Sequence, residues 1–172
     1  PPSLQLLNGN NEKSTLVFQS NPQHYNYQWG KVSTISYTNS KGEMLKGLLY
    51  YPSDYKEGTL YPMIVHVYEK QSQKINDYIN PSVYSYTGFN IVDLVTNGYF
   101  VLLPDINYTL GEPGDSATDC VTAAVENVLS LGIIAPKKIG LMGHSFGGYE
   151  TSYILTKSNI FATAIAGAAQ TD

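Results

Sequence analysis

Apolar residues in this 172-residue chain recur with the period of a strand in some segments and with that of a helix in others. Two β-rich runs, 32–38 and 44–51, flank a turn signal at 39–42 and predict a β-hairpin. The later apolar runs are continuous, which is typical of parallel strands that are covered on both faces. These runs are 62–68, 99–103, 139–142 and 161–166.

Helical patterns separate the later strands. The clearest helix is expected to begin at Ser116-Ala117-Thr118-Asp119, which resembles a capping box, and to continue with apolar residues at i, i+3, i+4 spacing. The apolar residues are Val121, Ala124, Val125, Val128 and Leu129. Shorter helices are expected at 90–97 and 146–157. Strands and helices that alternate in this way predict an α/β protein with a mostly parallel sheet.

The run 139–142 leads directly into Gly143-His144-Ser145-Phe146-Gly147, which matches the G-x-S-x-G pattern of a nucleophile elbow. A serine on a tight strand-to-helix turn needs neighbours without side chains, because the chain doubles back close to other backbone. Gly143, Gly147 and Gly148 meet this need. The pattern alone is weak evidence, but the expected strand before it and helix after it supply the required context. Ser145 is therefore predicted to be a nucleophile.

Composition argues against several classes of function. The chain is 42% hydrophobic and 14% charged, with a formal net charge of −4, which is typical of a globular protein. The ten lysines are scattered and there is no arginine, so no nucleic-acid or anionic-membrane partner is indicated, and no run approaches the length of a membrane span. The single cysteine, Cys120, is expected to be a small buried hydrophobe. No spacing resembles a metal-ligand motif, and no cofactor is implied.

The order of these segments resembles the N-terminal part of the catalytic domain of the prolyl oligopeptidase family, with its dipeptidyl peptidase IV and acylaminoacyl peptidase members. Four stretches carry the resemblance: 42–52, 61–68, 97–105 and 143–149. The resemblance implies an incomplete α/β-hydrolase fold over 29–172, with an N-terminal β-hairpin and a mostly parallel sheet. A β-propeller precedes the catalytic domain in that family, so residues 1–28 are expected to be the tail of a preceding β domain and a linker.

The resemblance also implies roles for three residues. Ser145 matches the acylated nucleophile, the backbone N–H of Phe146 matches one donor of the oxyanion hole, and Tyr68 matches the tyrosine whose hydroxyl is the other donor. Losing one preorganised donor typically costs about 2.7–4 kcal/mol of transition-state stabilisation. One departure concerns the turn after the tyrosine: it is glycine-rich in many family members, whereas Glu69-Lys70-Gln71 follows Tyr68 here.

The acid and base of a catalytic triad are harder to find. On this fold the order along the chain is Ser, then Asp or Glu, then His, yet none of the three histidines follows Ser145. His24 falls in the linker, His66 is expected to point away from the neighbours of Tyr68, and His144 is expected to point away from the site. None is expected to act as a base. Without a base, the acids Glu150 and Asp172 cannot complete a catalytic triad. The triad acid and base are therefore expected beyond residue 172.

Three interpretations of function stay open. The first is a fragment of a serine peptidase that hydrolyses oligopeptides, inactive alone because an unassisted serine is a poor nucleophile. The second is a lipase-like or esterase-like α/β-hydrolase, although the His-Gly-Gly-Gly oxyanion loop is missing. The third is a non-catalytic binding module on the same fold. The sheet is expected to end at 161–166 with an open apolar edge that permits self-association. The chain looks excised from a longer protein and carries no signal peptide, which leaves its compartment open.

Overall fold

A computed structural model describes residues 1–7, 9, 13–80, 85 and 87–170. Its strands are β1 (Ser3–Leu7), β2 (Ser14–Gln19), β3 (Val32–Thr38), β4 (Met44–Tyr50), β5 (Tyr61–Val67), β6 (Phe100–Pro104), β7 (Ile134–His144) and β8 (Thr163–Gly167). Its helices are α1 (Ile91–Thr96), α2 (Pro113–Leu129) and α3 (Phe146–Lys157), with 3-10 turns η1 (Pro22–Asn26) and η2 (Ser72–Asn76). The hydrophobic pattern therefore predicted the type and order of the elements from β3 to β8 correctly.

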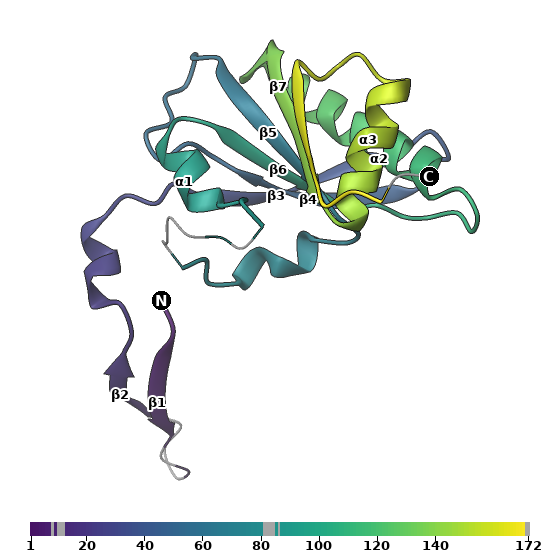
Figure 1. The fold of residues 1–172 in the computed structure, drawn as a ribbon. Coiled ribbons are helices and arrows are strands. Elements are labelled where there is room, and N and C mark those ends of the chain that lie inside the picture. The colour runs from purple at the N-terminus through teal and green to yellow at the C-terminus, as the bar shows by residue number, and fades with distance from the viewer. Residues whose placement is uncertain (8, 10–12, 81–84, 86, 171–172) are drawn as a thin grey trace.

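Strands β3 to β8 form one sheet in the order β3-β4-β6-β5-β7-β8. The hairpin β3–β4 and its neighbour β6 pair antiparallel, whereas β6, β5, β7 and β8 run parallel. The predicted fold class is thus confirmed. Because β5 and β7 are parallel neighbours in the middle of the sheet, their carboxyl ends lie side by side at one edge (Figure 1). Ligands bind at this edge in open α/β sheets.

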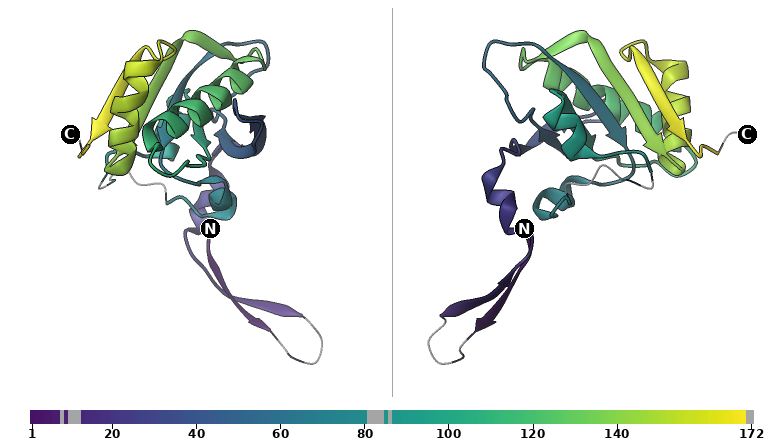
Figure 2. Two further views of the ribbon diagram at one scale, coloured as in Figure 1. Left: turned by 90° about the vertical axis from the view of Figure 1, so that its right-hand side faces the viewer. Right: turned by 60° about the vertical axis from the view of Figure 1, so that its left-hand side comes forward.

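Helices cover the two faces of the sheet unequally. Helices α2 and α3 pack together on one face, and α1 lies on the other face beside β6 (Figure 2). Met63, Val65 and Val67 of β5 are fully buried in the larger core, which α2 and α3 complete. Cys120 of α2 belongs to the same core, as predicted. Among the described residues β8 is an edge strand, and its Ile165 is 59% exposed.

The start of α2 differs from the prediction. The helix begins at Pro113 rather than at Ser116, and Glu112 is its N-cap residue. Proline suits a first helical position, since its φ is already helical and no N–H is needed there. The hydroxyl of Ser116 instead accepts a hydrogen bond from the N–H of Thr109, at 3.0 Å, and so holds the preceding loop. The capping-box prediction was therefore wrong.

The hairpin β1–β2 forms a separate two-stranded sheet that projects from the α/β body (Figure 1). Its apolar side chains are exposed on both faces: Leu6 is 65% exposed, and Leu7, which points to the opposite face, is 72% exposed. The hairpin therefore has no core of its own. A two-stranded hairpin of this kind is at best marginally stable alone in water. Among the described helices, none has the length and apolar character that a bilayer span requires.

Candidate active site

Ser145 stands between β7 and α3 in a strained backbone conformation. Its φ is 57° and its ψ is −119°, a region that non-glycine residues rarely occupy and that often marks functional sites. Its N–H donates to the carbonyl of Gly167 in β8 at 2.8 Å, and its carbonyl accepts from the N–H of Gly148 at 2.9 Å. The strand-serine-helix geometry that the motif predicts is therefore present. The chain turns sharply at Ser145, which lies at the carboxyl edge of the sheet.

Three glycines make this turn possible. A Cβ atom at Gly143 would lie less than 3.0 Å from the carbonyl of Gly147, and one at Gly147 would lie equally close to the carbonyl of Val67. A Cβ at Gly148 would meet the carbonyl of Gly167. Each obstacle is backbone that belongs to a neighbouring element and cannot swing aside. The predicted reason for these glycines, room for close backbone approach, is confirmed.

Tyr68 lies next to the elbow. It follows the last residue of β5, is 39% exposed, and places its Cδ2 atom 3.4 Å from where a Cβ of Gly147 would be. Tyr68 and Ser145 line one cavity of about 310 Å³. Phe146 opens α3, and the first N–H groups of a helix have no partner within the helix, so its N–H is available to an anion beside Ser145. The structure thus brings the three predicted site residues together.

The turn after Tyr68 is fixed by hydrogen bonds rather than by glycine. Glu69 has a φ of 26°, in the left-handed region that favours glycine. The buried carboxylate of Asp105, just after β6, accepts from the N–H groups of Gln71 and Ser72 at 2.7 and 2.8 Å and from the Ser72 hydroxyl at 2.6 Å. Gln71 also donates its side-chain amide to the carbonyl of His66 at 3.0 Å. Asp105 therefore anchors the turn that carries Tyr68.

Sequence reasoning missed Asp105 as a site residue. The signal was available, because an acid that directly follows a buried strand at the carboxyl edge of a parallel sheet is well placed to bind backbone N–H groups there. What the sequence does not show is which N–H groups these are, since Asp105 and the turn at 69–72 are far apart in the chain and the pairing of β5 with β6 brings them together.

The expected orientations of two histidines were wrong. His66 and His144 both line the cavity that contains Ser145 and Tyr68. Residues two apart on a strand share a face, so His66 lies on the side of Tyr68 rather than opposite it. Within the described part of the chain, however, no hydrogen bond joins either ring to the hydroxyl of Ser145.

The environment of His66 makes it a weak base. Its ring stacks on Phe89 with centroids 3.9 Å apart, and its Nδ1 atom is buried without a hydrogen-bond partner. Burial lowers the pKa of His66 to about 4, which the hydrogen bond with Gln71 only partly offsets. His66 is therefore neutral at pH 7 and forms an apolar wall of the cavity with Phe89.

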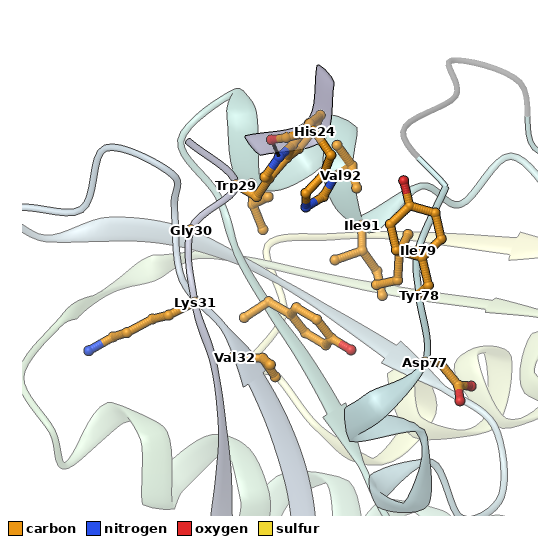
Figure 3. Close-up of a pocket in the computed structure, with 12 residues that line it drawn as sticks. His24, Trp29, Gly30, Lys31, Val32, Asp77, Tyr78, Ile79, Ile91 and Val92 are labelled. Carbon is orange, nitrogen blue, oxygen red and sulfur yellow. Dashed lines mark hydrogen bonds between the residues drawn. The ribbon is translucent and has the colours of Figure 1, made fainter. Parts of the chain in front are cut away.

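His24 lies apart from the elbow. It stacks on Trp29 with centroids 4.5 Å apart and lines a second cavity of about 260 Å³, between the segment that precedes β3 and helix α1 (Figure 3). Ser145 is not among the residues that line this cavity. Asp172 falls outside the described residues. Across the described ranges, no group of three or more His, Cys, Asp or Glu side chains is arranged to hold a metal ion.

A serine on such an elbow, at the carboxyl edge of a mostly parallel sheet, is the arrangement of an α/β-hydrolase. Comparison with known proteins narrows this class. The model of the prolyl oligopeptidase family matches residues 109–172, so the segment that includes the elbow is similar to that family. The predicted resemblance is confirmed.

The relatives are peptidases. The uncharacterized peptidase YuxL of Bacillus subtilis is 26% identical over 144 residues, which cover 76% of this chain and 20% of that protein. Dipeptidyl peptidase 8 of Mus musculus is 28% identical over 150 residues, which cover 78% of this chain and 16% of that protein. The structure of Pyrococcus horikoshii acylaminoacyl peptidase shares the fold with a TM-score of 0.73 at 20% identity, over 98% of this chain and 28% of that one. The chain thus spans a fifth or less of the length of these curated relatives.

Proposed function

We propose that residues 29–172 supply the nucleophile and the oxyanion hole of a serine peptidase that cleaves oligopeptides through an acyl-enzyme. The observation that carries this proposal is the strained backbone of Ser145, which shares one cavity with Tyr68. The peptidase relatives support peptide rather than lipid substrates, and nothing in the comparisons favours a lipase or a binding module.

The proposed chemistry follows from the positions of three groups. The Oγ atom of Ser145 attacks the scissile carbonyl while a base accepts its proton, and the carbonyl oxygen becomes an oxyanion. The N–H of Phe146 and the hydroxyl of Tyr68 donate to that oxyanion, which is more negative than the ground-state carbonyl and therefore gains more from both donors. Protonation of the amine expels the first product, and water then hydrolyses the acyl-enzyme by the same steps.

The proposal leaves the base and its acid partner outside residues 1–172. His66 is half-buried and neutral at pH 7, and no histidine follows Ser145. Loss of the base from such a triad costs on the order of 10⁶ in turnover. We therefore expect residues 1–172 alone to be nearly inactive, and the acid and base to come from a further segment of the protein.

Two structural features support further parts of the proposal. The exposed apolar faces of β1–β2 favour an assignment of residues 1–28 to the tail of a neighbouring β domain and a linker. The terminal position of β8 in the described sheet favours self-association of residues 1–172 at that edge, since unpaired edge strands pair readily with other chains.

Labelling with a fluorophosphonate probe, followed by peptide mapping, tests the proposed function. The full-length protein should be labelled at Ser145, and Ser145→Ala should abolish labelling and ester turnover. Residues 1–172 alone should label far more slowly. Absence of labelling in the full-length protein would overturn the peptidase proposal. Fast ester turnover by residues 1–172 would contradict the inference that the base lies outside these residues.

A further inference from the structure

Glu150 is a fully buried acid one turn into α3 from Ser145. Its Oε1 atom accepts a hydrogen bond from the hydroxyl of Tyr108, and its Oε2 atom is buried without a hydrogen-bond partner. Burying a carboxyl group is costly unless the surroundings compensate. An apolar residue at this position would pack without this cost. The presence of a buried acid therefore indicates a role beyond packing.

Tyr108 connects Glu150 to both sides of the proposed oxyanion hole. Its ring meets the ring of Phe146 edge to face, with centroids 5.8 Å apart. Burial raises the pKa of Tyr108, and the nearby backbone N–H of Glu69 opposes this rise. Two residues earlier, the N–H of Ile106 donates to the carbonyl of Glu69 at 3.2 Å.

The same loop therefore contacts the residue that follows each part of the site. Glu69 follows Tyr68 and has a strained φ of 26°, and Phe146 follows Ser145. Asp105 holds the far end of this turn, whereas Ile106 and Tyr108 restrain Glu69 itself, the residue next to Tyr68. Loss of this second restraint would let the hydroxyl of Tyr68 shift relative to the elbow.

The ionisation state of Glu150 suits a neutral hydrogen-bonding role. Burial raises the pKa of Glu150 to about 7, the hydrogen bond from Tyr108 opposes this rise, and the nearby carboxylate of Glu69 adds to it. A large share of Glu150 is therefore protonated near neutral pH. A glutamine, which has the same shape and keeps an acceptor for Tyr108, should replace it well.

We propose that Glu150 and Tyr108 are a positioning pair that holds the hydroxyl of Tyr68 and the N–H of Phe146 at a fixed separation. Neither residue touches the substrate in this inference, which rests on the proposed peptidase function. The pair affects stabilisation of the transition state more than substrate binding, because the separation of the two donors matters most when the oxyanion forms.

Steady-state kinetics of the full-length protein with a chromogenic acyl ester, together with the rate of fluorophosphonate labelling, test the pair. Tyr108→Phe removes only the hydroxyl, and Glu150→Leu keeps the volume without the acceptor. Each should lower kcat and the labelling rate about tenfold or more, since misplacing a catalytic group by about 1 Å can cost about 100-fold. KM should change less than about twofold. Glu150→Gln should retain near wild-type kcat.

Ile154→Val is the matched control, because Ile154 is fully buried one turn further along α3. It should leave kcat unchanged. Should Glu150→Leu fail to fold, as judged by circular dichroism, Tyr108→Phe decides the outcome. If Tyr108→Phe has the kcat and labelling rate of the wild type, the positioning role of the pair is overturned while the peptidase proposal stands. Absence of Ser145 labelling in the wild-type protein would overturn the peptidase proposal and the pair together.

Discussion

Two turns meet at the candidate site, and they solve the same problem differently. Ser145 in the elbow and Glu69 after Tyr68 both have positive φ, which is unfavourable for residues other than glycine. The elbow is surrounded by glycines that let neighbouring backbone approach closely. The turn at Glu69 has no glycine beside it and is held by hydrogen bonds to the segment after β6. A strained turn can thus be stabilised locally or by a distant polar segment.

Filling the space inside the elbow should have the largest effect. In Gly147→Ala the new Cβ would lie under 3.0 Å from the carbonyl of Val67, so β5 and α3 would have to separate. We expect a loss of about 3 kcal/mol or more in the free energy of unfolding, the upper end for overpacking, and loss of Ser145 labelling. Denaturant unfolding measures the first effect.

Gly132→Asn is the control for that substitution. Gly132 has a φ of 69° and open space around it, and asparagine tolerates this conformation. Its stability should stay within about 1 kcal/mol of wild type. Equal losses in both variants would mean that backbone conformation, and not close approach, accounts for the glycines of the elbow.

The buried acid behind both turns should make stability depend on pH. The pKa of Glu150 is raised to about 7 in the folded protein, from 4.5 when unfolded, so the folded state binds the extra proton between these values. Stability from this group is complete below about pH 4.5 and is lost as the pH rises through 7. Glu150→Gln should therefore gain stability relative to wild type over this range, by about 3 kcal/mol at pH 8.

His66 titrates over a similar range with the opposite sign. Its pKa of about 4 lies below the unfolded value of 6.5, so its contribution is complete above pH 6.5 and is lost as the pH falls toward 4. Because both proteins contain His66, the difference between Glu150→Gln and wild type isolates Glu150. Urea unfolding at pH 5 and pH 8 provides the measurement. A difference that does not change with pH would contradict a raised pKa for Glu150.

Removing the anchor of the second turn should have a smaller effect. In Asp105→Asn the side chain keeps one acceptor oxygen but loses its charge, and its amide faces the hydroxyl of Ser72. We expect a loss of about 2 kcal/mol in the free energy of unfolding, since hydrogen bonds to charged groups contribute about 1.5–3 kcal/mol. Turnover should fall with it, because the turn carries Tyr68. Unchanged stability and turnover would mean that other contacts fix this turn.

Relieving the strain at Glu69 should have the smallest effect. Glu69→Gly removes the unfavourable φ of 26° and should raise the free energy of unfolding by about 1 kcal/mol. Thermal unfolding measures this gain, and Lys70→Gly, one residue on without a positive φ, should instead lose stability. A loss in Glu69→Gly would show that the hydrogen bonds have already removed the strain.

The elbow could be predicted from the sequence because its requirements are local. Gly143, Ser145 and Gly147 are close in the chain, and a continuous apolar strand before them and a helical pattern after them complete the motif. The orientation of His66 could also have been predicted, since it shares the face of Tyr68 by strand alternation. The polar network of Glu150, Tyr108 and Asp105 could not, because each residue pairs with a partner far away in the sequence.

The sequence by itself determined the order of strands and helices, the central apolar strands and the strained serine. Hydrophobic periodicity and glycine placement specify these features through short-range sterics and burial. Only the tertiary structure decided that β5 lies between β6 and β7, which brings Tyr68 beside Ser145. It also decided that a buried acid on α3 reaches Tyr108. Side-chain hydrogen bonds between distant segments depend on strand pairing and helix packing, and one sequence specifies these only through the whole fold.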